Sequence, residues 1–167
     1  MRKINTLKTH YRNNKGVFIV SVITFINEEG GIGKTSVCFN VAWELSKRGS
    51  KILMIDMDGQ KANLSFFAGI NKDSELFTVL DVFKKNLDIQ ETIKPVKENL
   101  DIVPADSGVS NLDMSAKVSK FKKAIESVRD SYEHIFINCA HFLNSLIRIM
   151  DVEEVDRYRV QIRRTKA

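Results

Sequence analysis

One segment constrains the fold more than any other: an apolar run that passes directly into a glycine-rich turn and then into a helical pattern. The run is Val17–Asn27 (VFIVSVITFIN), in which β-branched and aromatic residues dominate. Such a continuous run is typical of a strand buried on both faces of a parallel sheet. The turn, Glu28–Ser36 (EEGGIGKTS), leads into apolar residues at helical spacing, namely Val37, Val41, Ala42 and Leu45. The segment therefore predicts a strand–loop–helix unit, with the helix closed by Arg48–Gly49.

The same alternation continues along the chain. Further strands are expected at Lys51–Asp56, Leu100–Pro104 and His134–Ile137. A helix is expected at Ser74–Lys85, with Leu76, Leu80 and Phe83 on one face, and another on the apolar spacing of Phe121, Ala124, Ile125 and Val128. Strands that alternate with helices indicate right-handed βαβ units, so the expected fold is α/β, a parallel sheet with flanking helices.

The glycine-rich turn has the residue types of a phosphate-binding loop. In Gly30–Thr35 (GGIGKT), glycines allow successive backbone N–H groups to converge on phosphate oxygens, and the helix N-terminus adds partial positive charge. Lys34 would reach the β- and γ-phosphates, and the Thr35 hydroxyl would coordinate Mg²⁺. The general P-loop pattern requires glycine at the position of Glu28, so a glycine-rich turn without a ligand remains the alternative interpretation.

Four ordered motifs resemble the ParA/MinD family of deviant Walker A ATPases, and the partition ParA branch most of all. The loop resembles the family's K-G-G-x-G-K-[ST] motif. Ile55–Gln60 (IDMDGQ) resembles its I-D-x-D-P-Q segment, Asn99–Ala105 (NLDIVPA) its N-L-D-x-I-P-A strand, and Ser131–Ala140 (SYEHIFINCA) its Walker B strand. The resemblance implies a P-loop NTPase-like fold.

The resemblance also implies ATP and Mg²⁺ as cofactors and gives roles to individual residues. Asp58 would position or activate the attacking water and Lys34 would act with it in catalysis. Thr35 and Asp56 would lie at the metal. The implied nucleotide-binding residues are Gly30, Gly31, Ile32, Gly33, Lys34, Thr35 and Ser36.

Several positions depart from the family pattern. The signature lysine falls at Glu29, the Walker B aspartate at Asn138 and the switch proline at Gly59. Glu29 would repel a triphosphate, and Asn138 lacks the negative charge that helps to order Mg²⁺. We therefore expect weak nucleotide binding and very low turnover.

Composition and charge predict three parts: a basic N-terminal arm (1–16), a partial P-loop nucleotide-binding domain (17–150) and a charged tail (151–167). The chain has 167 residues, 43% of them hydrophobic, which suits one core. The arm alone carries a charge of +5, which equals the net charge of the whole chain. Two interpretations of the arm are open: it attracts phosphate backbones, or it is a solvated terminus. The tail is expected to be a frayed helix or disordered, which would leave the family's fold incomplete in its C-terminal half and one edge of the first strand uncovered.

The remaining patterns bear on location and partners. Cys38 and Cys139 lie in apolar segments without metal-ligand spacing, so two free buried thiols in a reducing cytoplasm are expected. No apolar run approaches the roughly 20 residues of a membrane-spanning helix. The sequence also shows no pattern of a basic amphipathic C-terminal helix, which a MinD-like membrane protein would be expected to have. A basic cluster is read as a solvated helix face or a DNA contact: Lys117, Lys120, Lys122 and Lys123.

Three functions remain open at this level. The first is a ParA-like ATPase of plasmid or chromosome partition, with impaired hydrolysis, which dimerises on ATP, binds DNA without sequence preference and works with a centromere-binding protein. The second is a non-hydrolysing interaction or regulatory module that acts on a full-length relative. The third is an inactive truncated product.

Overall fold

The computed structural model describes residues 21–25, 31–59, 64–70, 76–113, 117–140 and 157–160. In these residues one sheet has the strand order β3-β4-β2-β5-β1-β6. The strands are β1 (Ser21–Phe25), β2 (Ile52–Met57), β3 (Lys94–Lys97), β4 (Leu100–Val103), β5 (His134–Cys139) and β6 (Arg157–Val160). All neighbours pair in parallel except β3, which is antiparallel to β4. The predicted α/β fold is confirmed, and the sheet is mostly rather than entirely parallel.

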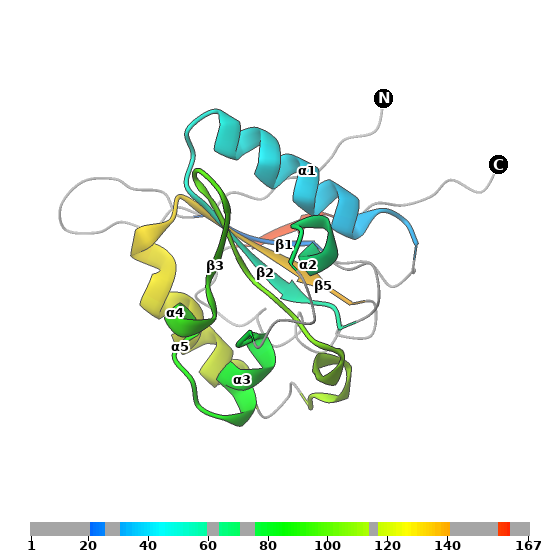
Figure 1. Ribbon diagram of the computed structural model, residues 1–167, viewed down its shortest axis with the longest axis vertical. Helices are drawn as coiled ribbons and strands as arrows, with labels where there is room; N and C mark the ends of the chain where they lie inside the picture. Colours follow the sequence, from blue (N-terminus) through cyan, green and yellow to red (C-terminus); the bar gives the residue numbers. More distant parts are fainter. Residues whose placement is uncertain are drawn as a thin grey trace.

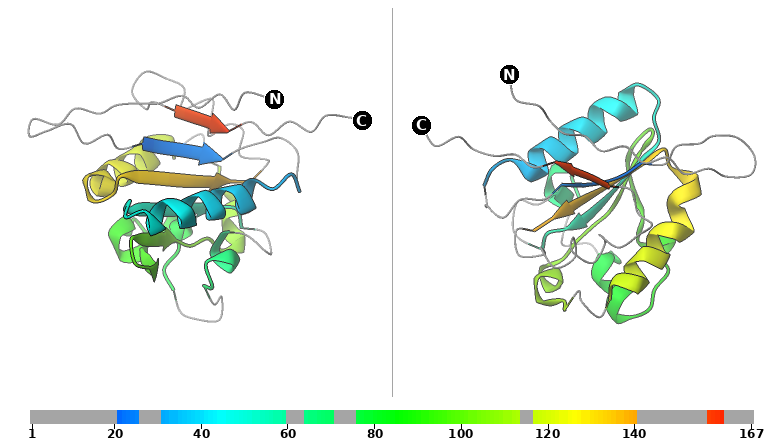
Figure 2. Two further views of the ribbon diagram at one scale, coloured as in Figure 1. Left: turned by 90° about the horizontal axis from the view of Figure 1, so that it is seen from above. Right: turned by 180° about the vertical axis from the view of Figure 1, so that it is seen from behind.

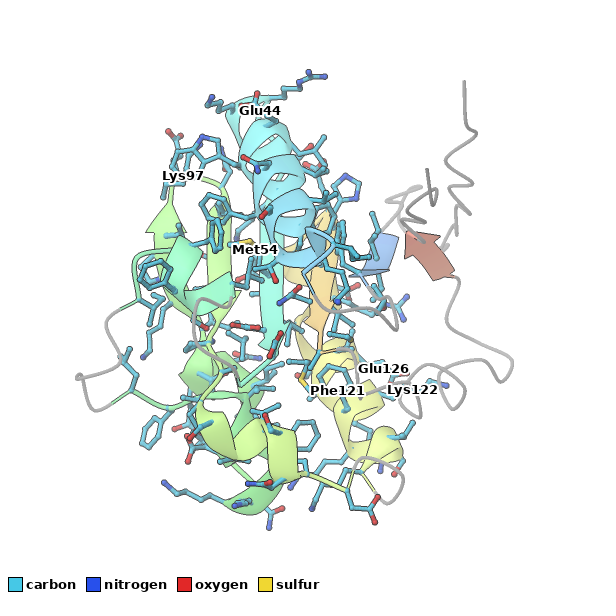
Figure 3. The ribbon with its side chains drawn as sticks, turned by 90° about the vertical axis from the view of Figure 1, so that its right-hand side faces the viewer. Glu44, Met54, Lys97, Phe121, Lys122 and Glu126 are labelled. Atoms are coloured by element: carbon cyan, nitrogen blue, oxygen red, sulfur yellow. The ribbon has the colours of Figure 1, made fainter. Side chains whose placement is uncertain are left out.

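Helices cover both faces of the sheet (Figure 1). The helices are α1 (Lys34–Lys47), α2 (Leu64–Phe67), α3 (Val79–Lys84), α4 (Ile89–Thr92) and α5 (Val118–Val128), with 3₁₀ turns η1 (Ser107–Asn111) and η2 (Arg129–Ser131). Helices α1 and α2 lie on one face, and α3, α4 and α5 lie on the other. In Figure 3, Met54 lies beneath α1, whereas Lys122 and Glu126 lie on the outer side of α5.

The central strand β2 shows how the two cores divide. Its residues are all buried, and successive side chains point to opposite faces of the sheet. Ile52 and Met54 pack under α1, whereas Leu53, Ile55 and Met57 pack against the helices on the other face. Asp56 therefore belongs, by alternation, to the α1 face of the sheet.

The predicted strands in β2, β4 and β5 are confirmed within one or two residues, and the helix predicted from the spacing of Phe121 to Val128 is confirmed as α5. The predicted closure of α1 is also confirmed, because Arg48 is its C-cap and Gly49 has a φ of 92°. Only glycine reaches such a conformation without strain.

The helix predicted at Ser74–Lys85 begins later than expected. Thr78 caps α3: its side chain accepts from the Leu80 N–H, and Asp81 accepts from the Thr78 N–H at 2.8 Å. This capping box sets the start of α3 at Val79. Leu76 therefore precedes the helix, and the expected face that included it is wrong.

The expectation that 151–167 contains no strand is also wrong. Arg157–Val160 forms β6, which pairs in parallel with β1 over Val22–Phe25. Figure 2 shows β6 (red) beside β1 (blue). The edge of β1 that we expected to be uncovered is thus paired, because a weakly patterned segment can form a strand when a neighbouring strand offers its hydrogen-bonding groups.

Some predictions concern residues outside the described ranges. These include the basic arm (1–16), the residues at Glu28, Glu29, Gly30 and Gln60, and the segment 141–150. The three-part division of the chain stays a prediction.

One lysine of the basic cluster has a structural role. Lys120 donates from Nζ to the Phe83 carbonyl oxygen at 3.3 Å and to the Asn86 side-chain oxygen. It therefore ties α5 to the C-terminal end of α3, where carbonyl groups lack helical partners. Within the described part of the chain, no helix is long and apolar enough to span a bilayer.

Gly59 gives a first prediction, because a Cβ at this buried position would lie 2.5 Å from the Asp106 carbonyl oxygen. Backbone cannot move aside as a flexible side chain can. We expect Gly59→Ala to lower the free energy of unfolding by about 1–3 kcal/mol, the usual cost of overpacking, as measured by urea denaturation. Glu126→Ala, on the exposed side of α5, is the control, because surface substitutions usually change the free energy of unfolding by less than about 0.5 kcal/mol. Equal stability of the two variants would contradict the close approach at Gly59.

Candidate functional site

The described part of the glycine-rich loop passes through two glycines with positive φ angles into the N-terminus of α1. Gly31 and Gly33 have φ angles of 71° and 89°, which favour glycine. Gly33 is the N-cap of α1 and accepts from the Val37 N–H at 2.9 Å. Among the described residues no side chain caps α1, and its first turn carries no acidic residue. The positive end of a 14-residue helix is therefore available to an anion.

The parallel register brings two polar side chains together beside this loop. Asp56 of β2 is the register partner of Asn138 of β5, and both residues alternate toward the α1 face. The Asn138 amide donates from Nδ2 to Asp56 Oδ1 at 3.2 Å. Thr35, in the first turn of α1, donates from Oγ1 to Asn138 Oδ1 at 3.4 Å. Three positions far apart in sequence thus form one hydrogen-bonded row.

Asp56 is fully buried, and both of its carboxylate oxygens are occupied. Oδ1 accepts from the Asp58 N–H at 3.1 Å as well as from Asn138. Oδ2 accepts from the Ser65 N–H at 2.9 Å and from Ser65 Oγ at 2.7 Å. Ser65 Oγ in turn accepts from the Ala105 N–H at 3.1 Å. Sequence reasoning missed Ser65, because no spacing rule links a serine at the start of a short helix to a carboxylate nine residues earlier.

Burial raises the pKa of the Asp56 carboxyl to about 6, although its hydrogen bonds from Ser65, Asp58 and Asn138 oppose the rise. Desolvation disfavours the charged form, and four donors recover only part of that loss. Asp56 is thus a buried group that is still mainly ionised at neutral pH.

The Asp56 pKa predicts a pH dependence of stability. Between the ordinary value of 3.8 and about 6, the folded state binds more protons than the unfolded state. The contribution of Asp56 to the free energy of unfolding therefore falls as pH rises through this window, by about 3 kcal/mol in all. We expect Asp56→Asn to remove this contribution when urea unfolding is compared at pH 5 and pH 7. An identical pH slope in the variant would contradict the raised pKa.

The other predicted site residues lie in the same cluster. Lys34 begins α1 with a buried side chain, and Asp58 follows β2 half-buried. Burial raises the pKa of the Cys139 thiol to about 12; the charges of Asp56 and Asp58 add to this rise, and that of Lys34 opposes it. Lys34 and both aspartates therefore lie within electrostatic range of one thiol. The expected free buried state of Cys38 and Cys139 is confirmed.

The residues present fit Mg²⁺ through the Thr35 hydroxyl as a ligand and the Asp56 carboxylate as a nearby charge. Mg²⁺ prefers oxygen ligands and usually shares them with phosphates and waters. The Thr35 hydroxyl donates a hydrogen bond to Asn138, so the lone pairs of the hydroxyl oxygen remain for a cation. Asp56 fits as a nearby negative charge, since its oxygens already accept from four donors. Over the described residues, no group of three or more His, Cys, Asp or Glu side chains could hold a metal ion.

Comparisons with known proteins agree with this geometry. The family described as AAA domain matches residues 20–155. The sporulation initiation inhibitor protein Soj of Bacillus subtilis is 30% identical over 131 residues, which are 75% of this chain and 51% of Soj. A plasmid partition protein from Borrelia burgdorferi has a TM-score of 0.64 at 27% identity, over 74% of this chain and 56% of that one. An ATP complex of a variant of McdA from Cyanothece has a TM-score of 0.63 at 25% identity, over 72% and 49%.

The chain thus spans about half the length of the relatives that it matches. The shared part contains the loop, α1 and the ends of β2 and β5, where the residues described above lie.

Proposed function

The chain belongs to the ParA/MinD family of P-loop ATPases, and on this premise we propose that it binds ATP with Mg²⁺ at Gly30–Ser36 and hydrolyses it slowly. The observation that carries the proposal is the uncapped N-terminus of α1 beside the row formed by Thr35, Asn138 and Asp56. Both features lie at the carboxyl edge of the sheet, where ligands of open α/β sheets bind.

Each residue has a role that its position supports. The backbone of Gly30–Gly33 and the first turn of α1 would surround the phosphates, with Lys34 neutralising their charge. Thr35 would bind Mg²⁺, and Asp58 would position the attacking water. Bound Mg²⁺ would supply charge neutralisation on the phosphate oxygens.

Slow hydrolysis follows from two positions. Glu29 would face a triphosphate with a like charge, at a cost of about 1–4 kcal/mol at close approach. Asn138 brings no charge of its own to the metal side of the loop. Positioning and charge neutralisation make up most of the catalysis of phosphoryl transfer, so the loss of either lowers the rate.

The biological role that fits best is plasmid or chromosome partition. The Borrelia protein is named for plasmid partition and Soj as a sporulation initiation inhibitor, and each matches about three quarters of this chain. In this role the protein would be cytoplasmic, dimerise on ATP, bind DNA without sequence preference and respond to a centromere-binding protein.

The test is calorimetric titration of the purified protein with ATP and Mg²⁺, with adenosine as the control ligand and phosphate release measured in parallel. We expect saturable ATP binding that raises the melting temperature, since ligand at a hundred times Kd stabilises by about 2.7 kcal/mol. Adenosine should give little heat, because the site described binds phosphates. Binding without phosphate release would favour the non-hydrolysing regulatory module, and no binding would refute the proposal.

A further inference from the structure

We propose that Asn138 and Asp56 divide between them the task of one acidic residue: Asn138 directs the Thr35 hydroxyl, and Asp56 supplies the negative charge from behind it. The inference rests on the proposed function, because the task concerns Mg²⁺ bound with ATP at Thr35. It makes Asn138 a positioning residue. Asparagine in place of aspartate at position 138 then weakens Mg²⁺ binding less than the loss of the aspartate charge alone would imply.

The orientation of the Asn138 amide is set by its neighbour. An ionised carboxylate accepts hydrogen bonds and donates none, so the Asn138 nitrogen must face Asp56 Oδ1, at 3.2 Å. The Asn138 oxygen then faces the loop, where it accepts from Thr35 Oγ1 at 3.4 Å. The Thr35 proton is consequently held toward β5, and the lone pairs of the hydroxyl are left for a cation.

The charge of Asp56 reaches Thr35 through this amide. A hydrogen bond to a carboxylate polarises the amide, which makes the amide oxygen a stronger acceptor. Asp56 is fully buried, so its charge is poorly screened by water. The row Asp56–Asn138–Thr35 therefore presents a negative end to the metal side of the loop, although the residue next to Thr35 is neutral.

Ser65 keeps Asp56 in place. Its N–H and hydroxyl both donate to Oδ2, which leaves Oδ1 directed at Asn138. The Ser65 hydroxyl is itself held by the Ala105 N–H at 3.1 Å, so the anchor joins α2 to the end of β4. The carboxylate is thus clamped on the side away from the loop.

Asp56→Asn is the decisive variant, because it keeps the shape of the side chain and reverses the direction of the hydrogen bonds between position 56, Asn138 and Thr35. The oxygen of the new amide would stay with the two Ser65 donors. Its nitrogen would face Asn138 and also the Asp58 N–H, which would lose its acceptor. Asn138 would then turn its oxygen toward position 56 and its nitrogen toward Thr35, which would become an acceptor. A lone pair of the Thr35 hydroxyl would be used up, and the negative charge would be gone.

The measurement is the affinity for ATP by calorimetry, with Mg²⁺ and with EDTA in its place. We expect Mg²⁺ to raise the affinity of the wild type by about tenfold or more, and Asp56→Asn and Asn138→Ala to lose most of this enhancement. Their affinities in EDTA should stay near that of the wild type, because the backbone and Lys34 still bind phosphate. Asp101→Asn is the matched control: Asp101 accepts from the Tyr132 hydroxyl at 2.8 Å, and an asparagine there keeps an acceptor.

A second readout needs no nucleotide. In the ¹⁵N spectrum of the Asn138 side chain, we expect Asp56→Asn to shift both amide proton resonances and Asp101→Asn to leave them unchanged. Should the Asp56 variant fail to fold, Ser65→Ala takes its place. It keeps the carboxylate but loosens its clamp, so a reduced Mg²⁺ enhancement and a shifted Asn138 resonance are expected.

The outcomes separate this inference from the proposed function. A wild-type protein that binds no ATP overturns both. A wild type whose Mg²⁺ enhancement persists undiminished in Asn138→Ala and Asp56→Asn overturns the divided role alone. Variants that lose ATP affinity equally in EDTA also overturn it, because they show a structural role for the pair.

Discussion

Lys34→Ala is expected to lower the affinity for Mg²⁺·ATP by roughly a hundredfold, because charged hydrogen bonds to phosphate contribute up to about 3 kcal/mol. Lys34 is the first residue of α1, beside Gly33 and next to Thr35. Its side chain is buried at the carboxyl edge of the sheet, within electrostatic range of Cys139. No other lysine or arginine lies in the described part of the loop, which runs over residues 31–36.

Calorimetric titration checks this prediction, and circular dichroism shows whether the variant keeps its helix content. Lys47→Ala is the matched control, because Lys47 ends the same helix, is exposed and pairs with Glu44 at 2.9 Å. An exposed pair of this kind contributes about 0–1 kcal/mol, so the control should fold and bind as the wild type does. Undiminished ATP binding by the Lys34 variant would place the phosphates elsewhere on the protein.

Asn138→Asp is expected to destabilise the ligand-free protein at pH 7 by about 3 kcal/mol, since the folded state must then bind a proton that an aspartate in the unfolded chain has lost at this pH. Asn138 is fully buried, and its Nδ2 lies 3.2 Å from Asp56 Oδ1. Two carboxylates this close do not both ionise, so the pair would share a proton at neutral pH.

The pH dependence of this variant has a definite sign. The shared proton means that the folded state binds more protons than the unfolded state, so the penalty increases as pH rises above the ordinary carboxyl range. Lowering the pH from 7 to 5 is therefore expected to recover stability in Asn138→Asp by more than in the wild type. Urea unfolding at both values measures this, with exposed Asn111→Asp as the control for a new carboxylate outside the site.

Mg²⁺·ATP should reverse part of this loss, because a divalent cation at Thr35 favours the doubly ionised pair. A larger rise of the melting temperature with Mg²⁺·ATP in Asn138→Asp than in the wild type is therefore expected, with faster phosphate release. An Asn138→Asp variant as stable as the wild type at pH 7, and without added pH dependence, would contradict the buried contact between the two side chains.

Local patterns in the sequence predicted most of the framework. The apolar runs at β2, β4 and β5, the spacing in α5 and the glycine that ends α1 were all correctly located, because each depends on residues within about a dozen positions. The glycine-rich turn before α1 is equally local, since Gly31, Gly33 and the start of α1 form one continuous stretch. The resemblance to ParA/MinD ATPases also rested on such stretches.

Other features depended on partners distant in sequence and were missed or misjudged. Pairing with the distant strand β1 made a strand of Arg157–Val160. The start of α3 was misjudged for a local reason, because the capping box of Thr78 and Asp81 places it after Leu76, against the apolar spacing. At Gly59 the sequence showed only a departure from the family's switch proline. In the fold, the backbone of Asp106 and Ser107 lies so close that a Cβ has no room there.

The sequence by itself determined that this is an α/β protein with a glycine-rich loop between its first strand and first helix, and that position 138 is an asparagine. Only the tertiary structure decided what this asparagine does. The role of Asn138 depends on the strand register that sets it beside Asp56, on its hydrogen bond from Thr35 and on the hydrogen bond from Ser65 to the Asp56 carboxylate. Hydrogen bonds and buried charges act over a few ångströms of space, and strand order rather than chain order brings these groups within that distance.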